Sequence, residues 1–508
     1  MKKLVGLALL VASGLAFTQG NQNASADPDP LLLRTSIDIT YEYHLRSADV
    51  LVEQKAIDAG IGNSGIDLSR DVLNVPPFAV IDWELGRKKG FAIGFAAELQ
   101  KEFSGDGYSS LFSPDNFLSL GQSGNPIAIE KNNLIAKGAI YWRSDNVDIT
   151  FGRDKVDLGE GLKGSLYPSP RLPYLDAFQF NGRLGRLGMN WIVATMEAKG
   201  SWDGVDVNPN EGLSPADYPT PSNLTYSELP YGFEDSANPT TIIEALHRFT
   251  WDFGKFQIGV AADVMYARRN NRFLITDFLP VMSWHQASIL SNNMSILADA
   301  SWTPIEGLRI MGMAGLDAFN VNSIGISNAT TPSEPACVFG AKYNGRVGPG
   351  AVDAYIEAGY THYLWGNFDG SPDSPHDVDP LARMIYRVQF DAGDGLIPLT
   401  SPYGPGATWC EFMGGLEPRG TNLRLGIDLL VLSKIWDANL IDTPSLTPLA
   451  DSSTFLFIQA AFPIRWRIGS FELYTTPAVL TRDGTWWVEA AFGAAYHFRN
   501  STEIGPVK

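Results

Sequence analysis

Cysteines, long hydrophobic runs and positive charge are all scarce in this chain. Only two cysteines, Cys337 and Cys410, stand among 508 residues, which excludes a disulfide-stapled scaffold. Cys337 falls on the apolar side of an alternating run, so we expect a small apolar residue there rather than half of a disulfide. Beyond residue 17 no stretch approaches the roughly 20 apolar residues of a membrane-spanning helix. The formal net charge of −18 argues against nucleic acid as a partner.

The first 26 residues have the composition of a secretory signal. Two lysines follow the initiating methionine, residues 4–17 are apolar, and small residues at 24–26 fit a cleavage site. The apolar part is too short for a spanning helix, and no cysteine follows it that could carry a lipid anchor. We therefore expect 1–26 to be removed on export and 27–508 to form a single domain.

Polar and apolar residues alternate with a period of two from Leu33 to His44. This is the pattern of a β-strand with one apolar and one polar face. Similar runs recur as far as Phe498, many joined by tight Gly, Asn or Asp turns that are typical of hairpins. In the first run the mostly apolar set is Leu33, Thr35, Ile37, Ile39, Tyr41 and Tyr43.

The repeated hairpins predict an all-β chain of about 18 antiparallel strands, with 16 as the alternative count. Most connections alternate between short and long. One place breaks this order: if 381–390 is a strand, the short-turn side would hold the connection 391–420, which then contains either a hidden short strand or an excursion. The long connections are expected at 45–76, 104–131, 154–174, 199–240, 267–286, 320–334, 364–380 and 434–451.

One-sided strands favour a transmembrane β-barrel with long extracellular loops over a soluble protein. A barrel turns its apolar residues outward toward lipid and carries aromatic residues near the strand ends. A soluble β-sandwich or β-helix does not need tryptophans such as Trp83, Trp142 and Trp191 at those positions. We therefore expect a location in the outer membrane of a Gram-negative-type cell, with membrane lipid as a partner.

The polar face of the strands would line the lumen. Charges of both signs occur on most strands, so the face is either a solvated, ion-paired wall or a binding surface for polar solutes. An 18-stranded cylinder is wide enough for an aqueous channel unless loops plug it. The charged residues of this face are Arg34, Asp38, Glu42, Asp82, Glu84, Glu98, Lys137, Arg143, Asp148, Glu244, Arg248, Asp263, Asp299, Arg309, Asp317, Asp353, Glu357, Arg383, Arg387, Arg424, Asp428, Arg465 and Glu489.

No arrangement in the sequence points to catalysis or to a metal. The six histidines are scattered, and His247 lies on the apolar face without a serine poised opposite. The loop 369–379 is acidic but lacks the spacing of a calcium loop. We expect no catalytic residues, metal or cofactor, and a barrel-embedded hydrolase is a distant alternative.

Residues 149–197 carry a motif beyond the alternation. A strand ends in Gly152-Arg153-Asp154, and the loop that follows contains Gly159, Gly161 and Gly164. A proline-containing stretch then leads into the next strand. This motif resembles the capsule assembly protein Wzi family of outer-membrane barrels. The chain departs from it at Asp157-Leu158, where the family motif has an aromatic residue.

Weaker matches extend the resemblance toward residue 430. It implies an 18-stranded barrel whose external face associates with surface polysaccharide, without chemistry. A porin-type channel for small polar solutes is the alternative. Glycines let such a loop fold back tightly, and an arginine can hold its carboxylates or carbonyls. The candidate binding residues in loop and lumen are Arg153, Asp154, Gly159, Gly161, Gly164, Arg248 and Asp317.

Overall fold

The structure is a computed structural model, and parts of the chain fall outside what it describes. The predicted signal segment 1–26, Gly161 and the acidic stretch 369–379 lie outside the described residues. Within them, no helix is long and apolar enough to cross a membrane. The described residues are 30–46, 77–99, 133–156, 158–159, 164–168, 172, 174–197, 240–269, 292–317, 334–348, 350–366, 384–390, 393–401, 403–435 and 454–504.

In the described ranges, the regular secondary structure consists of β-strands alone. The first part of the chain forms β1 Leu31–Arg46, β2 Ala79–Gly86, β3 Gly90–Leu99, β4 Asn133–Arg143, β5 Val147–Asp154, β6 Leu175–Leu184, β7 Leu187–Glu197, β8 Thr240–Asp252, β9 Phe256–Arg269, β10 Asn292–Ile305 and β11 Leu308–Leu316. The rest forms β12 Pro335–Val347, β13 Gly350–Thr361, β14 Ile385–Phe390, β15 Gly393–Pro398, β16 Ala407–Pro418, β17 Leu423–Ile435, β18 Thr454–Ala461, β19 Ile464–Ile468, β20 Phe471–Arg482 and β21 Thr485–Ile504.

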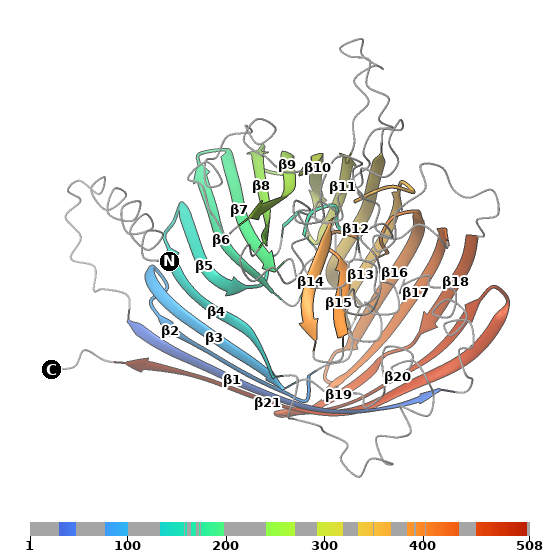
Figure 1. The fold of residues 1–508 in the computed structure, drawn as a ribbon. Helices are drawn as coiled ribbons and strands as arrows, with labels where there is room; N and C mark the ends of the chain where they lie inside the picture. The colour runs from blue at the N-terminus through green and yellow to red at the C-terminus, as the bar shows by residue number, and fades with distance from the viewer. Residues whose placement is uncertain are drawn as a thin grey trace, which may run out of the picture.

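The wall strands pair antiparallel with their neighbours and the last closes on the first (Figure 1). The seam between β1 and β21 runs from Leu31 opposite Ile504 to Arg46 opposite Glu489. Strands β18 and β19 both pair with β17 and β20, so they are two halves of one wall strand. The break falls at Pro463, which has no N–H for a ladder hydrogen bond. The nineteen strands of the large sheet thus form eighteen wall positions, which confirms the predicted β-barrel and its strand count.

Strands β14 and β15 do not belong to the wall. They pair only with each other, while β13 pairs directly with β16. Figure 1 shows this hairpin within the ring of wall strands. The stretch 391–420, expected to be a connection with a hidden short strand or an excursion, contains the short strand β15 and also the wall strand β16. The prediction that Arg387 lines the wall was wrong because β14 is part of the connection 362–406. Local alternation cannot distinguish a hairpin inside a barrel from a hairpin of its wall.

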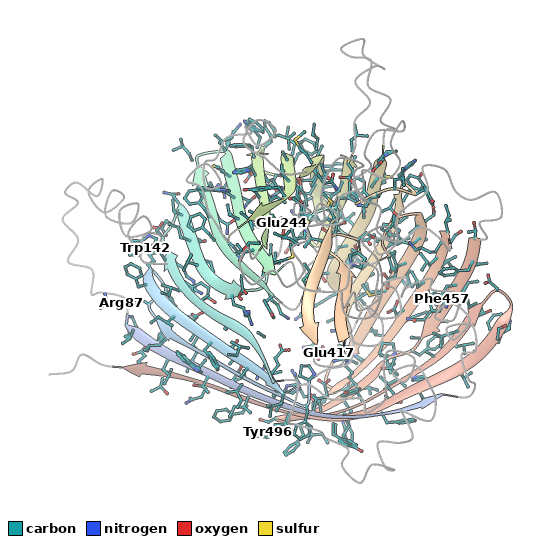
Figure 2. The ribbon with its side chains drawn as sticks, viewed as in Figure 1. Arg87, Trp142, Glu244, Glu417, Phe457 and Tyr496 are labelled. Atoms are coloured by element: carbon teal, nitrogen blue, oxygen red, sulfur yellow. The ribbon has the colours of Figure 1, made fainter. Side chains whose placement is uncertain are left out.

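The pairing register gives the wall an apolar outer face. Large hydrophobic side chains of one parity are exposed on most wall strands, as at Ile93, Phe339 and Val488, and Tyr496 projects away from the barrel (Figure 2). This is the surface that a transmembrane barrel presents to lipid. Cys337 and Cys410 share this face and both are free, as expected for Cys337.

The two ends of the barrel differ. Eight short turns, from 87–89 to 469–470, lie at one end together with Leu31 and Ile504, and we call this the turn end. The strand ends that the long connections join lie at the opposite end, which we call the loop end. Strands β20 and β21 are joined there by a tight turn at Asp483-Gly484. This asymmetry is the one expected of an outer-membrane barrel.

Candidate functional site

The described residues of the connection 155–174, between β5 and β6, reach into the barrel, and we call this connection the first insert. The Tyr167 hydroxyl donates to Asp299 on β10 at 2.6 Å, and the Gly164 N–H donates to Glu357 on β13 at 2.6 Å. Both acceptors lie on the face opposite to the exposed apolar one. Because the wall is closed, a segment anchored at β5 and β6 reaches these side chains only through the interior.

A buried ion pair holds the middle of this insert. The Arg248 guanidinium on β8 donates from Nε and Nη2 to the two oxygens of Asp299, at 2.8 and 2.6 Å. Its Nη1 donates to Asn190 at 3.0 Å, and the Arg248 and Asp299 side chains are 8% and 1% exposed. Burial, reinforced by the Asp299 carboxylate, raises the pKa of the Tyr167 phenol, which therefore stays a hydrogen-bond donor.

Glu357 forms the second attachment of the first insert. The Trp409 indole N–H donates at 3.2 Å to the same Glu357 oxygen that accepts from Gly164, and the Tyr355 hydroxyl donates to the other. A Cβ on Gly164 would stand 2.4 Å from the Trp409 ring. Gly159 has φ +80°, and a Cβ there would stand 2.5 Å from the Tyr167 ring. Close approach thus explains glycine at both positions.

The connection 362–406, which we call the second insert, is fastened next to the first. Asp317, one residue beyond β11, accepts from Ser295 at 2.6 Å and from the Gly366 N–H at 2.7 Å. Burial raises the pKa of the Asp317 carboxyl to about 6. The Thr361 hydroxyl donates to the Gly404 carbonyl at 2.7 Å, so both ends of the insert are tied to the wall.

The two inserts share one apolar cluster with the wall. Leu166, Trp365 and Leu399 from the inserts are at most 1% exposed, and they join one cluster with Trp409 and Phe457 on the wall. A water-filled barrel needs no such core, since its lumen is polar. This half of the interior, along β6 to β18, is therefore packed like the inside of a soluble protein.

Arg153 and Asp154 do not reach this interior contact. Arg153 lies on the outer parity and donates to both oxygens of Asp176 on β6, at 2.7 and 2.8 Å, with Tyr174 stacked against it at 3.8 Å. Asp154 accepts from the Tyr141 hydroxyl at 2.6 Å. Both residues make these contacts at the base of the first insert.

Two carboxyls behind the inserts have no hydrogen-bond donor. Glu244 on β8 and Asp263 on β9 lie on the inner face, 0% and 1% exposed, and none of their four oxygens has a partner. Figure 2 labels Glu244. Burying two carboxyls without a side-chain donor or counter-charge costs free energy. Within the described part of the chain, no three His, Cys, Asp or Glu side chains form a group that could hold a metal.

The remaining wall, β19 to β4, is polar and partly open. Glu84 accepts from Arg34 and from Arg143, with both guanidiniums within 3.0 Å. Across the seam Asp38 accepts from Arg499 at 2.8 and 2.9 Å. A cavity of about 370 Å³ lies between these strands at the turn end. This wall matches the expected solvated, ion-paired lining.

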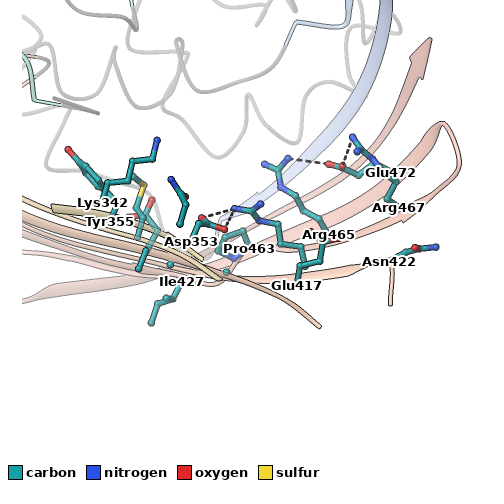
Figure 3. A pocket seen from close by; sticks show the side chains of 17 residues that line it. Lys342, Asp353, Tyr355, Glu417, Asn422, Ile427, Pro463, Arg465, Arg467 and Glu472 are labelled. Atoms are coloured by element: carbon teal, nitrogen blue, oxygen red, sulfur yellow. Dashed lines mark hydrogen bonds and ion pairs between the residues drawn. The ribbon is translucent and has the colours of Figure 1, made fainter. Parts of the chain in front are cut away.

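A larger cavity of about 840 Å³ lies along β12 to β20 near the turn end, and we call it the turn-end cavity (Figure 3). Arg424 donates to both oxygens of Asp353 at 2.8 Å. At one side Arg465 and Arg467 both face Glu472. The site is lined by residues of both charges together with asparagines and one tyrosine, Tyr355.

Sequence reasoning found some of this arrangement and missed the rest. Arg248 and Asp317 hold the inserts. Gly159 packs against Tyr167 within the first insert, and Gly164 binds Glu357 on the wall. The partners Asp299 and Glu357 stood among the charges predicted for the lumen, but Tyr167 and Trp409 were not singled out. Tyr167 could have been identified as an aromatic residue inside a glycine-rich loop. Glycines allow the backbone to approach an aromatic ring closely.

Together these features define a closed antiparallel β-barrel of the outer-membrane type with its interior partly filled by its own connections. No family model and no curated protein matches the chain. Among solved structures it is similar to Wzi, described as an outer membrane protein involved in group 1 capsule assembly in Escherichia coli and a carbohydrate binding β-barrel, with TM-score 0.49 and 11% identity over 91% of this chain and 83% of that one.

It is also similar to two other solved barrels. One is a variant of OccD1 (OprD), with TM-score 0.43 and 8% identity over 94% of this chain and 98% of that one. The other is OpdK of Pseudomonas aeruginosa with vanillate, with TM-score 0.40 and 8% identity over 92% and 99%. At these identities the likeness concerns the fold alone.

Proposed function

We propose that this chain is an integral outer-membrane β-barrel that binds or organises surface polysaccharide through its loop end, without chemistry. The observation that carries the proposal is the filled interior. Two inserts are fastened to the wall by the buried Arg248–Asp299 pair and by Glu357, and they share one apolar cluster with it. A packed interior does not favour free diffusion of solutes through the barrel. The loop end is therefore the surface that we expect to bind polysaccharide.

Location and processing belong to the same proposal. The exposed apolar outer face fits outer-membrane lipid as a partner, and residues 1–26 would direct export and be removed. A non-catalytic role agrees with the position of His247. Its side chain lies on the outer face of the wall and stacks on Trp191, away from the inserts. Lipase, protease and glycosidase assays on the wild type and on His247→Ala are expected to show no activity in either protein.

Two measurements on the purified, detergent-solubilised barrel test this function. In planar lipid bilayers we expect no steady conductance, because the inserts obstruct the lumen. On immobilised capsular polysaccharide we expect retention of the intact barrel. If none of a panel of immobilised bacterial polysaccharides retains the barrel, the polysaccharide function is refuted.

A porin-type channel for small polar solutes is the second candidate. It is favoured by the polar wall from β19 to β4. The side chains of Arg34, Arg143 and Arg499 are ion-paired there and are still 46%, 30% and 58% exposed. Steady conductance in the wild-type protein that falls when Arg34 or Arg143 is replaced by glutamine would favour this function over the first.

A further inference from the structure

We propose that the turn-end cavity is a binding site for an anionic sugar that enters from the turn end. This site is distinct from the loop end and goes beyond the proposed function. Its volume of about 840 Å³ lies within the range of about 300–1,000 Å³ typical of small-molecule sites.

The cavity is closed toward the loop end. Its deepest lining residues are Tyr355, Met413 and Asp428. The next inward-facing residues along the same strands are Glu357, Glu411 and Leu430, which are 1%, 0% and 7% exposed. Glu357 also holds the first insert through the Gly164 N–H. A solute in the cavity therefore meets a closed layer, so the cavity retains a ligand rather than passing it on.

Two arginines give one side of the cavity a surplus positive charge. Arg465 Nη1 lies 3.1 Å and Arg467 Nη2 3.7 Å from the Glu472 carboxylate, so two guanidiniums share one negative charge. The arginine side chains are 55% and 62% exposed, whereas that of Glu472 is 11% exposed. The Arg465 guanidinium also lies 5.6 Å from the centre of the Tyr474 ring, which orients it. Each guanidinium has five N–H donors, so both can still donate to an incoming anion.

The rest of the lining limits the charge to that side and suits hydroxyl groups. Arg424 is neutralised by its two hydrogen bonds to Asp353. The other charged residues of the lining are Lys342, Glu417 and Asp428, so this part of the cavity has no surplus positive charge. The surplus positive charge is therefore local to the arginine pair. The amides of Asn344 and Asn422 both donate and accept, as sugar hydroxyls do. An acid group at the arginines with hydroxyls toward the amides matches this distribution.

Isothermal titration of the purified full-length barrel in detergent tests the site, with a digalacturonate and its methyl ester as probes. The methyl ester removes the charge and leaves the sugar hydroxyls unchanged, so we expect it to bind about tenfold or more weakly than the acid. The double variant R465Q/R467Q should lose affinity for the acid by a similar factor. The control Arg183→Gln replaces an exposed arginine on β6 that pairs with Asp252, outside the cavity lining, and should bind like the wild type.

Several results would overturn the assignment. They are equal binding of acid and ester, unchanged binding by R465Q/R467Q, or inorganic phosphate binding as tightly as the digalacturonate, which would leave an anion site without a sugar. If the double variant does not fold, judged by heat-modifiable migration on a gel, the single variants Arg465→Gln and Arg467→Gln replace it. Retention on capsular polysaccharide is measured on the same samples, so failure of this site is distinguishable from failure of the loop-end function.

Discussion

Arginine–aspartate pairs joined by two hydrogen bonds recur in this barrel, and two of them, Arg248–Asp299 and Arg424–Asp353, lie in different surroundings. The Arg248–Asp299 side chains are 8% and 1% exposed, and the Arg424–Asp353 side chains are 49% and 45% exposed. Burial decides what such a pair contributes, because breaking a buried pair strands an uncompensated charge, whereas water replaces an exposed partner.

Arg248→Gln is expected to destabilise the barrel by about 3–5 kcal/mol, because it leaves the Asp299 carboxylate buried without its counter-charge. The matched control Arg424→Gln should cost less than about 1 kcal/mol. Urea unfolding of the two variants in lipid, followed by tryptophan fluorescence, measures both. Equal losses would show that the Arg248 pair does not fasten the first insert.

Asp317 makes stability depend on pH. Burial raises the pKa of its carboxyl from the ordinary 3.8 to about 6, so folding favours the protonated form. Its contribution is fully present below about pH 4 and is lost as pH rises through 6, a change of about 3 kcal/mol. We expect Asp317→Asn to remove this part of the fall in the free energy of unfolding. Parallel curves for both proteins between pH 4 and 7 would contradict the assignment.

At the scale of elements, alternation of side chains proved a good guide to the wall and a poor one to what lies inside it. A period of two depends only on neighbours in sequence, so the run from Leu33 to His44 predicted β1 and its inner face. The sites at which the inserts attach to the wall depend on contacts between residues far apart in sequence. Gly164 and Glu357, for example, are 193 residues apart. No local pattern encodes such a contact, so the second insert was misassigned.

Gly164→Ala is expected to unseat the first insert, because its Cβ would stand 2.4 Å from the Trp409 ring and 2.6 Å from the Glu357 carboxylate. Steady conductance should then appear in planar bilayers and trypsin should cut the insert faster. The control Gly138→Ala places its Cβ no nearer than 4.0 Å to any neighbour and should behave as wild type. If the Gly164→Ala variant shows no conductance and is cut by trypsin no faster than the wild type, the insert tolerates the added Cβ.

At the scale of the whole molecule, the residues after Phe498 complete the wall. The alternating runs in the sequence extend as far as this aromatic residue, but β21 continues to Ile504 and pairs there with Leu31 and its neighbours. Arg499, the first of the extra residues, binds Asp38 on β1 with two hydrogen bonds. The extension therefore belongs to the seam.

A chain that ends at Phe498 is expected to close less stably, because it loses six backbone pairings, from Ser36 with Arg499 to Leu31 with Ile504, and the Asp38–Arg499 pair. The temperature at which the folded band converts to the unfolded band on a gel should fall. Asp38→Asn in the full-length chain isolates the ion pair from the backbone pairing. An unchanged conversion temperature in the truncated chain would show that the extension is dispensable.

The seam also sets an order for assembly. Asp38 and Arg499 are 461 residues apart in sequence, so their contact has nearly the largest loop-closure cost that this chain offers. Hairpins such as β8–β9 need no such search and can form early. Until the seam closes, β1 and β21 are two unpaired edges that can recruit other strands. The barrel therefore depends, late in its folding, on whatever shields those two edges.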